Sequence, residues 1–229
     1  MKNTMKSAGR KADAGPAAPR LDRLRPVGAE TLSEQSGDWE GVSVERGVAG
    51  PVERPHAVWH GSLFRGVVFV GCRLHGVQWS DLRFEGCDLS NIDLNGAVLH
   101  RVAFAGCKLL GASLSDATLN HVSMVQCNGR YLNLSGSRLR RLRAVSCDFT
   151  EGVFNDCRTD GVVFDDCTFC GAEFSHTALR GIDLRSSHLS GLRLNPEDLR
   201  GAVVAPAQAL DLLPLLGVTI RSEADDPDE

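Results

Sequence analysis

The chain has 229 residues, of which 42% are hydrophobic and 24% are charged, and its formal net charge is −4. These values are ordinary for a soluble globular protein and exclude a wholly disordered chain. No apolar run approaches the roughly 20 residues that a membrane-spanning helix needs. The basic N-terminus is not followed by the apolar stretch of a secretory signal. We therefore expect a cytoplasmic protein of one or two domains, without a membrane partner.

The first segment, residues 1–36, is rich in Ala, Gly, Pro and basic side chains and shows little periodicity. This composition predicts a flexible basic arm. Residues 37–58 keep the five-residue spacing of the following segment at Trp39 and Val44, but Pro51 interrupts it. We expect residues 37–58 to form an irregular first coil that covers the open N-terminal edge of the fold.

The long central segment, residues 59–204, repeats every five residues. All nine phenylalanines stand at positions ending in 4 or 9, and most other positions of that series, from Phe64 to Leu199, are leucine. Small apolar residues stand two positions earlier, and glycine often stands two positions later. Period five fits neither a helix nor a flat strand. It fits a five-residue side that ends in a turn, with both apolar positions facing inward and glycine at the third turn position, where a type II turn needs a positive φ.

Units such as Ile92-Asp93-Leu94 and Ile182-Asp183-Leu184 resemble the A-(D/N)-L-x-x unit of the pentapeptide-repeat family. The resemblance covers about residues 60–204 and implies an all-β fold, a right-handed quadrilateral β-helix with a short C-terminal helix. Four sides of five residues make one coil, so we expect about seven coils stacked roughly 4.8 Å apart. Because side chains fill the interior, no large pocket is expected.

The cysteines follow the same repeat. Seven of the eight occupy the small inward positions, and five of these are spaced by 20 residues and should stack in one buried column: Cys87, Cys107, Cys127, Cys147 and Cys167. Buried cysteine packs as a small hydrophobic side chain. Cys167 and Cys170 form a CxxC, which is half of a common zinc site, but no second half follows. We favour packing over a redox relay and expect no metal and no cofactor.

The character of the chain changes over residues 205–221. The sequence predicts a short helix over 206–213, which Pro214 should end or kink, then a turn at Gly217 and a short strand over 218–220. In pentapeptide-repeat proteins that act on gyrase, a similar C-terminus forms a two-fold dimer, so the resemblance implies a homodimer; a monomeric cap is the alternative. The expected dimer contacts are Leu210, Leu213, Leu216, Val218 and Ile220. The acidic residues 222–229 are expected to be disordered.

No catalytic motif and no metal-ligand spacing is present, so we expect a protein without enzymatic activity whose outward side chains carry its function. Between residues 61 and 200, basic and acidic residues are equal in number, but the sides differ. One side is rich in arginine: Arg101, Arg138, Arg140, Arg141, Arg158, Arg180 and Arg200. Two other sides carry an excess of carboxylates: Asp88, Asp93, Asp116, Asp148, Glu151, Asp156 and Glu173.

Two functions remain open at this point. The resemblance implies a DNA mimic that binds DNA gyrase or topoisomerase IV through its acidic sides and binds no nucleic acid itself. The uninterrupted coils resemble the loop-free actinobacterial members related to gyrase-interacting quinolone-resistance proteins, although the neutral coil departs from a strongly anionic mimic. The alternative is a protein-interaction scaffold that recognises carboxylate or phosphate groups through the arginine-rich side.

Overall fold

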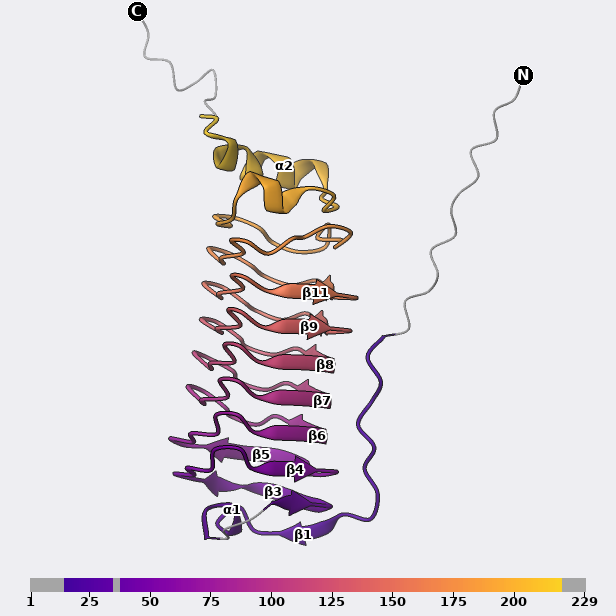
Figure 1. Ribbon diagram of the computed structural model, residues 1–229, viewed down its shortest axis with the longest axis vertical. Helices are drawn as coiled ribbons and strands as arrows, with labels where there is room; N and C mark the ends of the chain where they lie inside the picture. Colours follow the sequence, from indigo (N-terminus) through magenta and orange to yellow (C-terminus); the bar gives the residue numbers. More distant parts are fainter. Residues whose placement is uncertain (1–14, 35–37, 220–229) are drawn as a thin grey trace, which may run out of the picture.

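The computed structural model describes residues 15–34 and 38–219 and shows a rod of stacked coils (Figure 1). The pairings between its strands are parallel. The strands are β1 (Arg25–Val27), β2 (Trp39–Glu40), β3 (Val42–Ala49), β4 (Val58–His60), β5 (Leu63–Phe69), β6 (Gln78–Glu85), β7 (Val98–Ala105), β8 (Thr118–Val125), β9 (Arg138–Arg140), β10 (Arg143–Val145), β11 (Arg158–Asp160) and β12 (Val163–Asp165). The helices are α1 (Thr31–Glu34), η1 (Pro196–Leu199), α2 (Pro206–Leu212) and η2 (Leu213–Leu216).

Each coil is 20 residues long, because strands of neighbouring coils pair with that offset. Phe64 lies beside Phe84, which lies beside Phe104, and Trp79 lies between Trp59 and the next centre. The main path of the sheet runs β1-β3-β5-β6-β7-β8-β10-β12. The expected solenoid of about seven coils is therefore confirmed.

The turns between sides have the conformation that the glycine spacing predicts. The backbone N–H of Val77 donates to the carbonyl oxygen of Leu74 at 3.4 Å, which closes a four-residue turn that starts at the centre. Gly76 occupies the third position of this turn with a φ of +67°. A left-handed residue at this point turns the chain by one side without breaking the stack, and glycine adopts it at no steric cost.

The core is a set of stacked files of side chains. The rings of Phe64 and Phe84 stack with centroids 4.9 Å apart, and those of Phe154 and Phe174 stack at 4.5 Å. Phe104, whose burial the repeat predicts, is only 1% exposed. The inward facing of the five-residue centres is therefore confirmed, and each coil buries its interior against its two neighbours.

The predicted cysteine column is present in the core. The thiol of Cys87 donates to the carbonyl oxygen of Phe64 at 3.4 Å, and the backbone N–H of Cys127 faces Sγ of Cys147 at 3.5 Å. In the neighbouring file, burial raises the pKa of the Cys157 thiol to about 11. These thiols are packing groups that satisfy backbone carbonyls.

The N-terminal end of the rod is covered by residues that the sequence assigned to an arm. β1 pairs with β3 on its outer edge, and Ala29 and Leu32 are buried beside it. Residues 38–58 are themselves in register with the next coil, since Trp39 pairs with Trp59. Residues 25–34 thus cover the N-terminal edge that the sequence analysis assigned to residues 37–58, and residues 38–58 form a coil of the stack. The apolar residues scattered through the basic segment bury against the first coil.

The C-terminal end is covered by the predicted helix. The Gln208 side chain fixes α2, because its Nε2 donates to the carbonyl oxygen of Leu184 at 2.7 Å while its Oε1 accepts from the backbone N–H of Ala205 at 2.7 Å. η2 follows and ends at Gly217, as the turn prediction required. Val218 and Thr219 are not in a strand, so the strand prediction is wrong for them. Ile220 and residues 222–229 lie outside the described residues.

Candidate interaction surfaces

A group of exposed like charges lies on the last coils of the arginine-rich side. We call these five exposed side chains the Arg face: Arg138, Arg140, Arg158, Arg180 and Arg200. β9 and β11 set the geometry, since Arg138 pairs with Arg158 in their ladder while the residues between the arginines point inward. The period of five thus brings guanidinium groups from four consecutive coils onto one side of the rod.

The Arg face is poorly neutralised. Arg140 approaches Asp160 at 3.4 Å between Nε and Oδ2, with both side chains mostly in solvent. Among the residues that the structure describes, no carboxylate forms an ion pair with Arg138, Arg158, Arg180 or Arg200. Like charges stacked on adjacent strands destabilise a sheet slightly, so the fold alone gives no reason for this arrangement.

Two arginines expected on this side are engaged elsewhere. Arg101 pairs with Asp81, with 2.6 Å between Nε and Oδ1 and 2.5 Å between Nη2 and Oδ2. Arg141 contacts the ring of His121 at 3.0 Å through Nη1. Arg101 is therefore not available to a partner, and we leave both residues out of the Arg face.

Asp81 is a buried carboxylate, although the five-residue repeat predicts that carboxylates face outward. It is 1% exposed and receives two hydrogen bonds from Arg101 and one, at 2.8 Å, from the backbone N–H of Arg20. Burial acts to raise the pKa of the Asp81 carboxyl, but the hydrogen bonds from Arg101 and Arg20 outweigh it and hold that pKa below its usual value. The sequence spacing could have predicted this ion pair, because Asp81 and Arg101 are 20 residues apart and therefore lie at the same corner of neighbouring coils.

Residues 15–24 form a strap along this corner of the rod. The backbone N–H of Arg20 reaches Asp81, and that of Ala17 reaches Nδ1 of His121 at 2.8 Å. These two corners are two coils, roughly 10 Å, apart, which is the reach of three extended residues. The strap therefore runs parallel to the rod axis, from β1 toward the C-terminal end (Figure 1).

Acidification is expected to release the strap at its upper contact. Nδ1 of His121 can accept a hydrogen bond from Ala17 only when it is unprotonated. Burial and the nearby charges of Arg141, His100 and Arg101 lower the pKa of His121, so the folded protein disfavours the protonated ring. The contact is complete above the ordinary histidine pKa of about 6.5 and weakens as the pH falls below it.

Hydrogen-exchange protection of the Ala17 amide measures this effect. After correction for the intrinsic rate, protection should be lower at about pH 5.5 than at about pH 7.5. The Arg20 amide, which is held by Asp81, is the internal control and should keep its protection in this range. A His121→Gln variant should lose the dependence on pH, and equal protection of Ala17 at both values would rule out the histidine contact.

The acidic residues lie outward, and Asp88, Asp93 and Asp148 accept hydrogen bonds within their own turns. Oδ1 of Asp88 accepts from the backbone N–H and the hydroxyl of Ser90, at 3.0 and 2.6 Å. In the same way, Oδ1 of Asp148 accepts from the backbone N–H and the hydroxyl of Thr150, at 2.9 and 2.6 Å. Glu151 and Glu173 share Arg193.

The acidic residues do not stack into columns, because the equivalent positions of neighbouring coils hold basic or neutral residues. Asp88 pairs in the stack with Lys108 on one side and Val68 on the other. Asp93 lies between Arg73 and Ser113. Asp116 and Asp156 are exposed corner residues with a positive φ. The carboxylates are therefore interspersed with basic and neutral side chains, and no continuous negative face forms among them.

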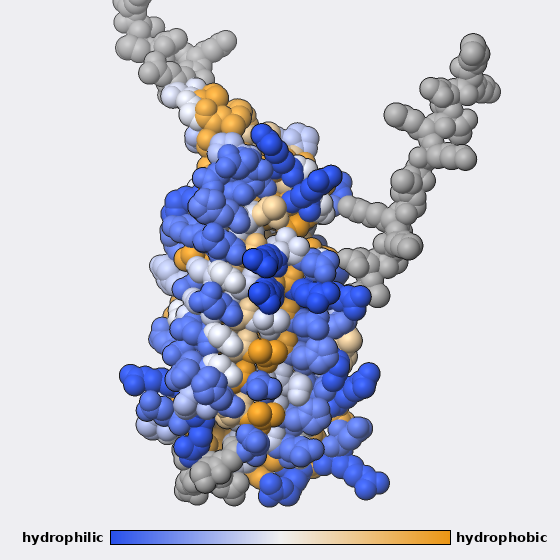
Figure 2. Space-filling model, in the orientation of Figure 1, coloured by the Kyte–Doolittle hydropathy of each residue, from blue (hydrophilic) through white to orange (hydrophobic). Residues whose placement is uncertain are grey.

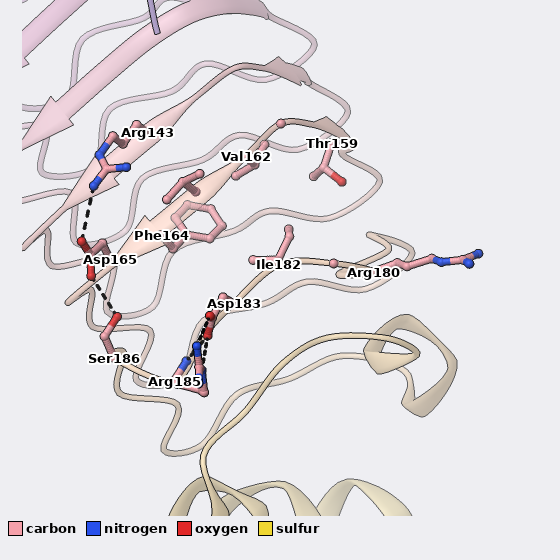
Figure 3. Close-up of a pocket in the computed structure, with 13 residues that line it drawn as sticks. Arg143, Thr159, Val162, Phe164, Asp165, Arg180, Ile182, Asp183, Arg185 and Ser186 are labelled. Atoms are coloured by element: carbon pink, nitrogen blue, oxygen red, sulfur yellow. Dashed lines mark hydrogen bonds and ion pairs between the residues drawn. The ribbon is translucent and has the colours of Figure 1, made fainter. Parts of the chain in front are cut away.

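A cleft of about 780 Å³ opens beside the coil that carries β11 and β12 (Figure 3). β12 pairs with β10 below it, but the coil above, residues 178–186, contains no strand. In the coil of β11, the central inward position is occupied by Thr159, which is half-buried. The equivalent positions in the coils below and above are occupied by the buried Leu139 and Leu179. The prediction that no large pocket exists is wrong here.

Four charged side chains of the cleft form two ion pairs, while Arg180, which also lines the cleft, has no carboxylate partner among the described residues. Arg143 faces Asp165 at 3.4 Å, and Arg185 binds Asp183 with 2.7 Å between Nη2 and Oδ2 (Figure 3). Between them, Phe164 closes the base of the cleft and is buried. Exposed ion pairs of this kind contribute little to stability, and they leave these four charges neutralised within the cleft.

The part of the chain that the structure covers holds neither a metal-binding group of side chains nor a membrane-spanning helix. Within residues 15–34 and 38–219, no three His, Cys, Asp or Glu side chains are grouped so that they could hold a metal ion. Within the same residues, no helix has the length and apolar character needed to cross a membrane.

Comparisons with known proteins agree with the repeat. Residues 97–151 match a model described as a pentapeptide repeat region, and residues 147–185 match a model of eight copies of pentapeptide repeats. No curated protein sequence matches the chain. Among solved structures, a trypsin-treated form of QnrB1, a plasmid-mediated fluoroquinolone resistance protein, aligns with a TM-score of 0.52 and 22% identity over 88% of this chain and 94% of that chain.

A second solved structure is HetL, a pentapeptide repeat protein involved in heterocyst differentiation regulation from the cyanobacterium Nostoc. It aligns with a TM-score of 0.49 and 18% identity over 73% of this chain and 84% of that chain. The alignment with QnrB1 shows a shared fold. The 20-residue register, the buried five-residue centres and the two family matches lead to one conclusion: the chain is a pentapeptide-repeat protein.

Proposed function

We propose that this pentapeptide-repeat protein is not an enzyme and acts by binding an anionic macromolecular partner through the Arg face. The observation that carries the proposal is the stacking of exposed guanidinium groups on four consecutive coils, with Arg138 and Arg158 side by side in one ladder. Arginine recognises phosphate and carboxylate groups through its planar set of donors. A partner that brings such groups would relieve the repulsion within the face.

The rest of the rod supports a binding role. Its interior is filled by stacked side chains, and the ion pairs of the cleft neutralise the carboxylates there. A rigid solenoid displays a fixed, extended surface, which suits recognition of a long partner.

Chromatography on immobilised heparin, a sulfated polyanion, tests the proposal. The protein has a net charge of −4, so retention requires a local basic surface. Changing Arg138, Arg158 and Arg180 together to Gln should lower the salt concentration needed for elution.

The matched control removes three arginines from other sides by changing Arg73, Arg83 and Arg130 to Gln. The control variant should elute close to the wild type. If the two triple variants elute together, the Arg face has no special role and the proposal fails.

A second candidate is a DNA mimic that binds DNA gyrase or topoisomerase IV. It is supported by the outward carboxylates and by the likeness in fold to QnrB1, a fluoroquinolone resistance protein. Converting five carboxylates to their amides would remove charge and keep shape, and the set is Asp88, Asp93, Asp148, Glu151 and Asp156. If the protein inhibits supercoiling by gyrase, this variant should inhibit less and with a smaller dependence on salt. No effect of the wild-type protein on either enzyme would remove this candidate.

We also propose that the C-terminal end joins two copies of the chain. Leu210 and Leu216 are 59% and 63% exposed, and hydrophobic surface gathers at this end of the rod (Figure 2). Contiguous exposed apolar side chains of this kind mark association sites. Leu213 is half-buried and Val218 is exposed at the same end.

Changing Leu210 and Leu216 to Glu should convert a dimer into a monomer, as measured by light scattering coupled to size-exclusion chromatography. The buried Leu212 and Gln208 stay in place, so α2 keeps its anchors. Val48→Glu is the control, because Val48 is equally exposed, at 60%, near the other end. A wild-type protein that is monomeric at tens of micromolar would rule out this dimer.

A further inference from the structure

The cleft beside β12 interrupts the backbone ladder that joins the coils below it. Arg143 pairs with Ser123 on one side and with Val163 on the other. The next residue of this file, Asp183, forms its bridge with Val203, in the coil above it. β12 is the last strand on the main path of the sheet. Within residues 15–34 and 38–219, the upper edge of β12 therefore has no strand partner.

The backbone groups on this edge follow from the register below it. The N–H of Val163 donates downward to the carbonyl oxygen of Leu142 at 2.9 Å. Because the polar groups of successive residues in an extended strand point to opposite edges, the N–H and C=O of Phe164 point toward the cleft. The N–H of Gly161 does so too, since its equivalent one coil below, the N–H of Arg141, donates upward. Among the described residues, neither Gly161 nor Phe164 donates to the coil above.

Two hydroxyl groups join the coils at the ends of the cleft. Oγ1 of Thr159 donates to the carbonyl oxygen of Ala178 at 3.2 Å, and Oγ of Ser186 accepts from the backbone N–H of Asp166 at 3.0 Å. One coil lower, the contact equivalent to that of Asp166 is a direct backbone hydrogen bond. Side chains thus take the place of the ladder at both ends, and residues 160–165 border the opening between them.

The walls of the cleft combine apolar surface with one cation in excess. Val162, Phe164 and Ile182 supply the apolar part. Three arginines and two aspartates line the cleft, an excess of one positive charge. Arg180 is the arginine outside the two ion pairs, and Figure 3 shows it at the end of the cleft near Thr159, apart from those pairs.

From these observations we infer that the cleft binds an extended peptide segment of a partner protein, which adds to β12 as a further strand. The main chain of the peptide pairs with the edge groups of Gly161 and Phe164, as in other strand-addition complexes. Its apolar side chains pack on Val162 and Ile182, and a carboxylate side chain binds Arg180. The inference does not rest on the proposed function, because the cleft shares only Arg180 with the Arg face.

A peptide suits this site better than a small molecule or a nucleic acid. The cleft, at about 780 Å³, has the size of an ordinary ligand site. However, its polar groups are main-chain donors and acceptors that recur along a strand edge, and a second strand repeats its own N–H and C=O groups with the same spacing. A nucleic acid supplies phosphate acceptors but no matching row of donors, so it would leave the carbonyl groups of the edge unpaired.

Hydrogen exchange tests the open edge in the full chain without a ligand. The amides of Gly161 and Phe164 should exchange faster than those of Arg141 and Ala144, which occupy the same places one coil below and point into the intact ladder. Equal protection at the two levels would show that the edge is closed, and the inference would fail at its premise.

The probe for binding is a phage-displayed library of random peptides of about eight residues, the length of an ordinary strand. Selection on the wild type should enrich peptides with alternating apolar residues and one Asp or Glu. Thr159→Leu serves for counter-selection, because it restores the leucine found at Leu139 and Leu179 and should draw the two coils together. That variant keeps the fold, as circular dichroism can check, and should bind the enriched peptides at least about tenfold more weakly.

An enriched peptide is then synthesised with a fluorescent label and measured by anisotropy. Methylation of every second amide nitrogen removes the donors from one edge of the peptide only. One of the two alternating methylated forms should lose about tenfold or more in affinity, and the other should stay within about threefold of the parent. In the complex, the amides of Gly161 and Phe164 should gain protection from exchange.

Arg180→Gln and Arg200→Gln form a matched pair, since both arginines belong to the Arg face but only Arg180 lines the cleft. Arg180→Gln should bind the acidic peptide about tenfold more weakly, because a charge-assisted hydrogen bond is lost. Arg200→Gln should bind it within about twofold of the wild type. Replacing the carboxylate of the peptide by its amide should remove the difference between the two variants.

Four results would overturn the inference: no enrichment over Thr159→Leu, equal binding of the two methylated forms, equal effects of Arg180→Gln and Arg200→Gln, or release of a dimer by the peptide, which would make a second copy of this chain the occupant. The heparin experiment is independent of these outcomes. If the peptide binds as expected while the triple arginine variant matches its control on heparin, the inference stands and the proposed function fails. If no peptide binds while the heparin result holds, the proposed function stands alone.

Discussion

Replacing Phe154 with alanine is expected to lower the free energy of unfolding by about 3–5 kcal/mol. The side chain is 1% exposed, and its ring stacks on Phe174 and meets Phe149 edge-on at 5.6 Å. Removing the ring exposes its neighbours to a cavity that the rigid coils cannot close. Because each coil contacts only the coils next to it, the loss falls on this coil and its two neighbours and cannot be shared along the rod.

Urea unfolding measures this loss, and Arg140→Ala provides the surface control. Arg140 forms only an exposed ion pair with Asp160, so its removal should change stability by less than about 0.5 kcal/mol. Phe154→Leu should fall between the two, since leucine fills most other centres of the repeat. Equal midpoints for Phe154→Ala and Arg140→Ala would contradict the inward facing of the centres.

The central rod could be predicted from sequence because one periodicity controls it. A residue and its partner 20 positions later occupy the same place on adjacent coils, and the spacing runs without insertion to Leu199. Facing, turn positions and the cysteine column all follow from that single rule. The Arg face follows as well, since its members keep the period on one side.

The strap and the buried carboxylate could not be predicted, because they depend on contacts outside the repeat. Residues 15–24 have no periodicity, and their position is fixed by two backbone hydrogen bonds to corner side chains. Asp81 has the spacing of an outward corner residue, but Arg101 and the strap cover it. The cleft was missed for a related reason: Thr159 keeps the period but supplies less apolar surface than leucine.

Asp81→Asn is expected to lower the free energy of unfolding by about 3 kcal/mol. The change removes the charge that faces Arg101, and leaving one member of a buried ion pair alone typically costs about 3–5 kcal/mol. Arg101 keeps some access to water, with 20% of its side chain exposed, so we expect the lower end of this range. Asparagine tolerates the positive φ of this corner, and its amide oxygen can still accept from the Arg20 N–H.

Asp160→Asn is the matched control, because it makes the same chemical change in the exposed pair with Arg140, where Asp160 is 72% exposed. That variant should cost less than about 0.5 kcal/mol. Combining Asp81→Asn with Arg101→Gln should recover part of the loss, since neither charge is then left buried alone. A double variant that loses the full sum of the two single changes would show that the pair is not coupled.

The dependence on pH gives an independent check of the same pair. The folded protein holds the pKa of Asp81 below its usual value, which is about 3.9 in an unfolded chain. Its contribution to stability is therefore complete above about pH 3.9 and is lost as the pH falls through the lower folded pKa. Between about pH 7 and pH 3, the difference in stability between wild type and Asp81→Asn should stay large at first and then shrink at the acidic end. A constant difference in stability down to the lowest pH would mean that the ionised carboxylate does not stabilise this corner. The lower stability of Asp81→Asn would then come from the packing of the asparagine side chain.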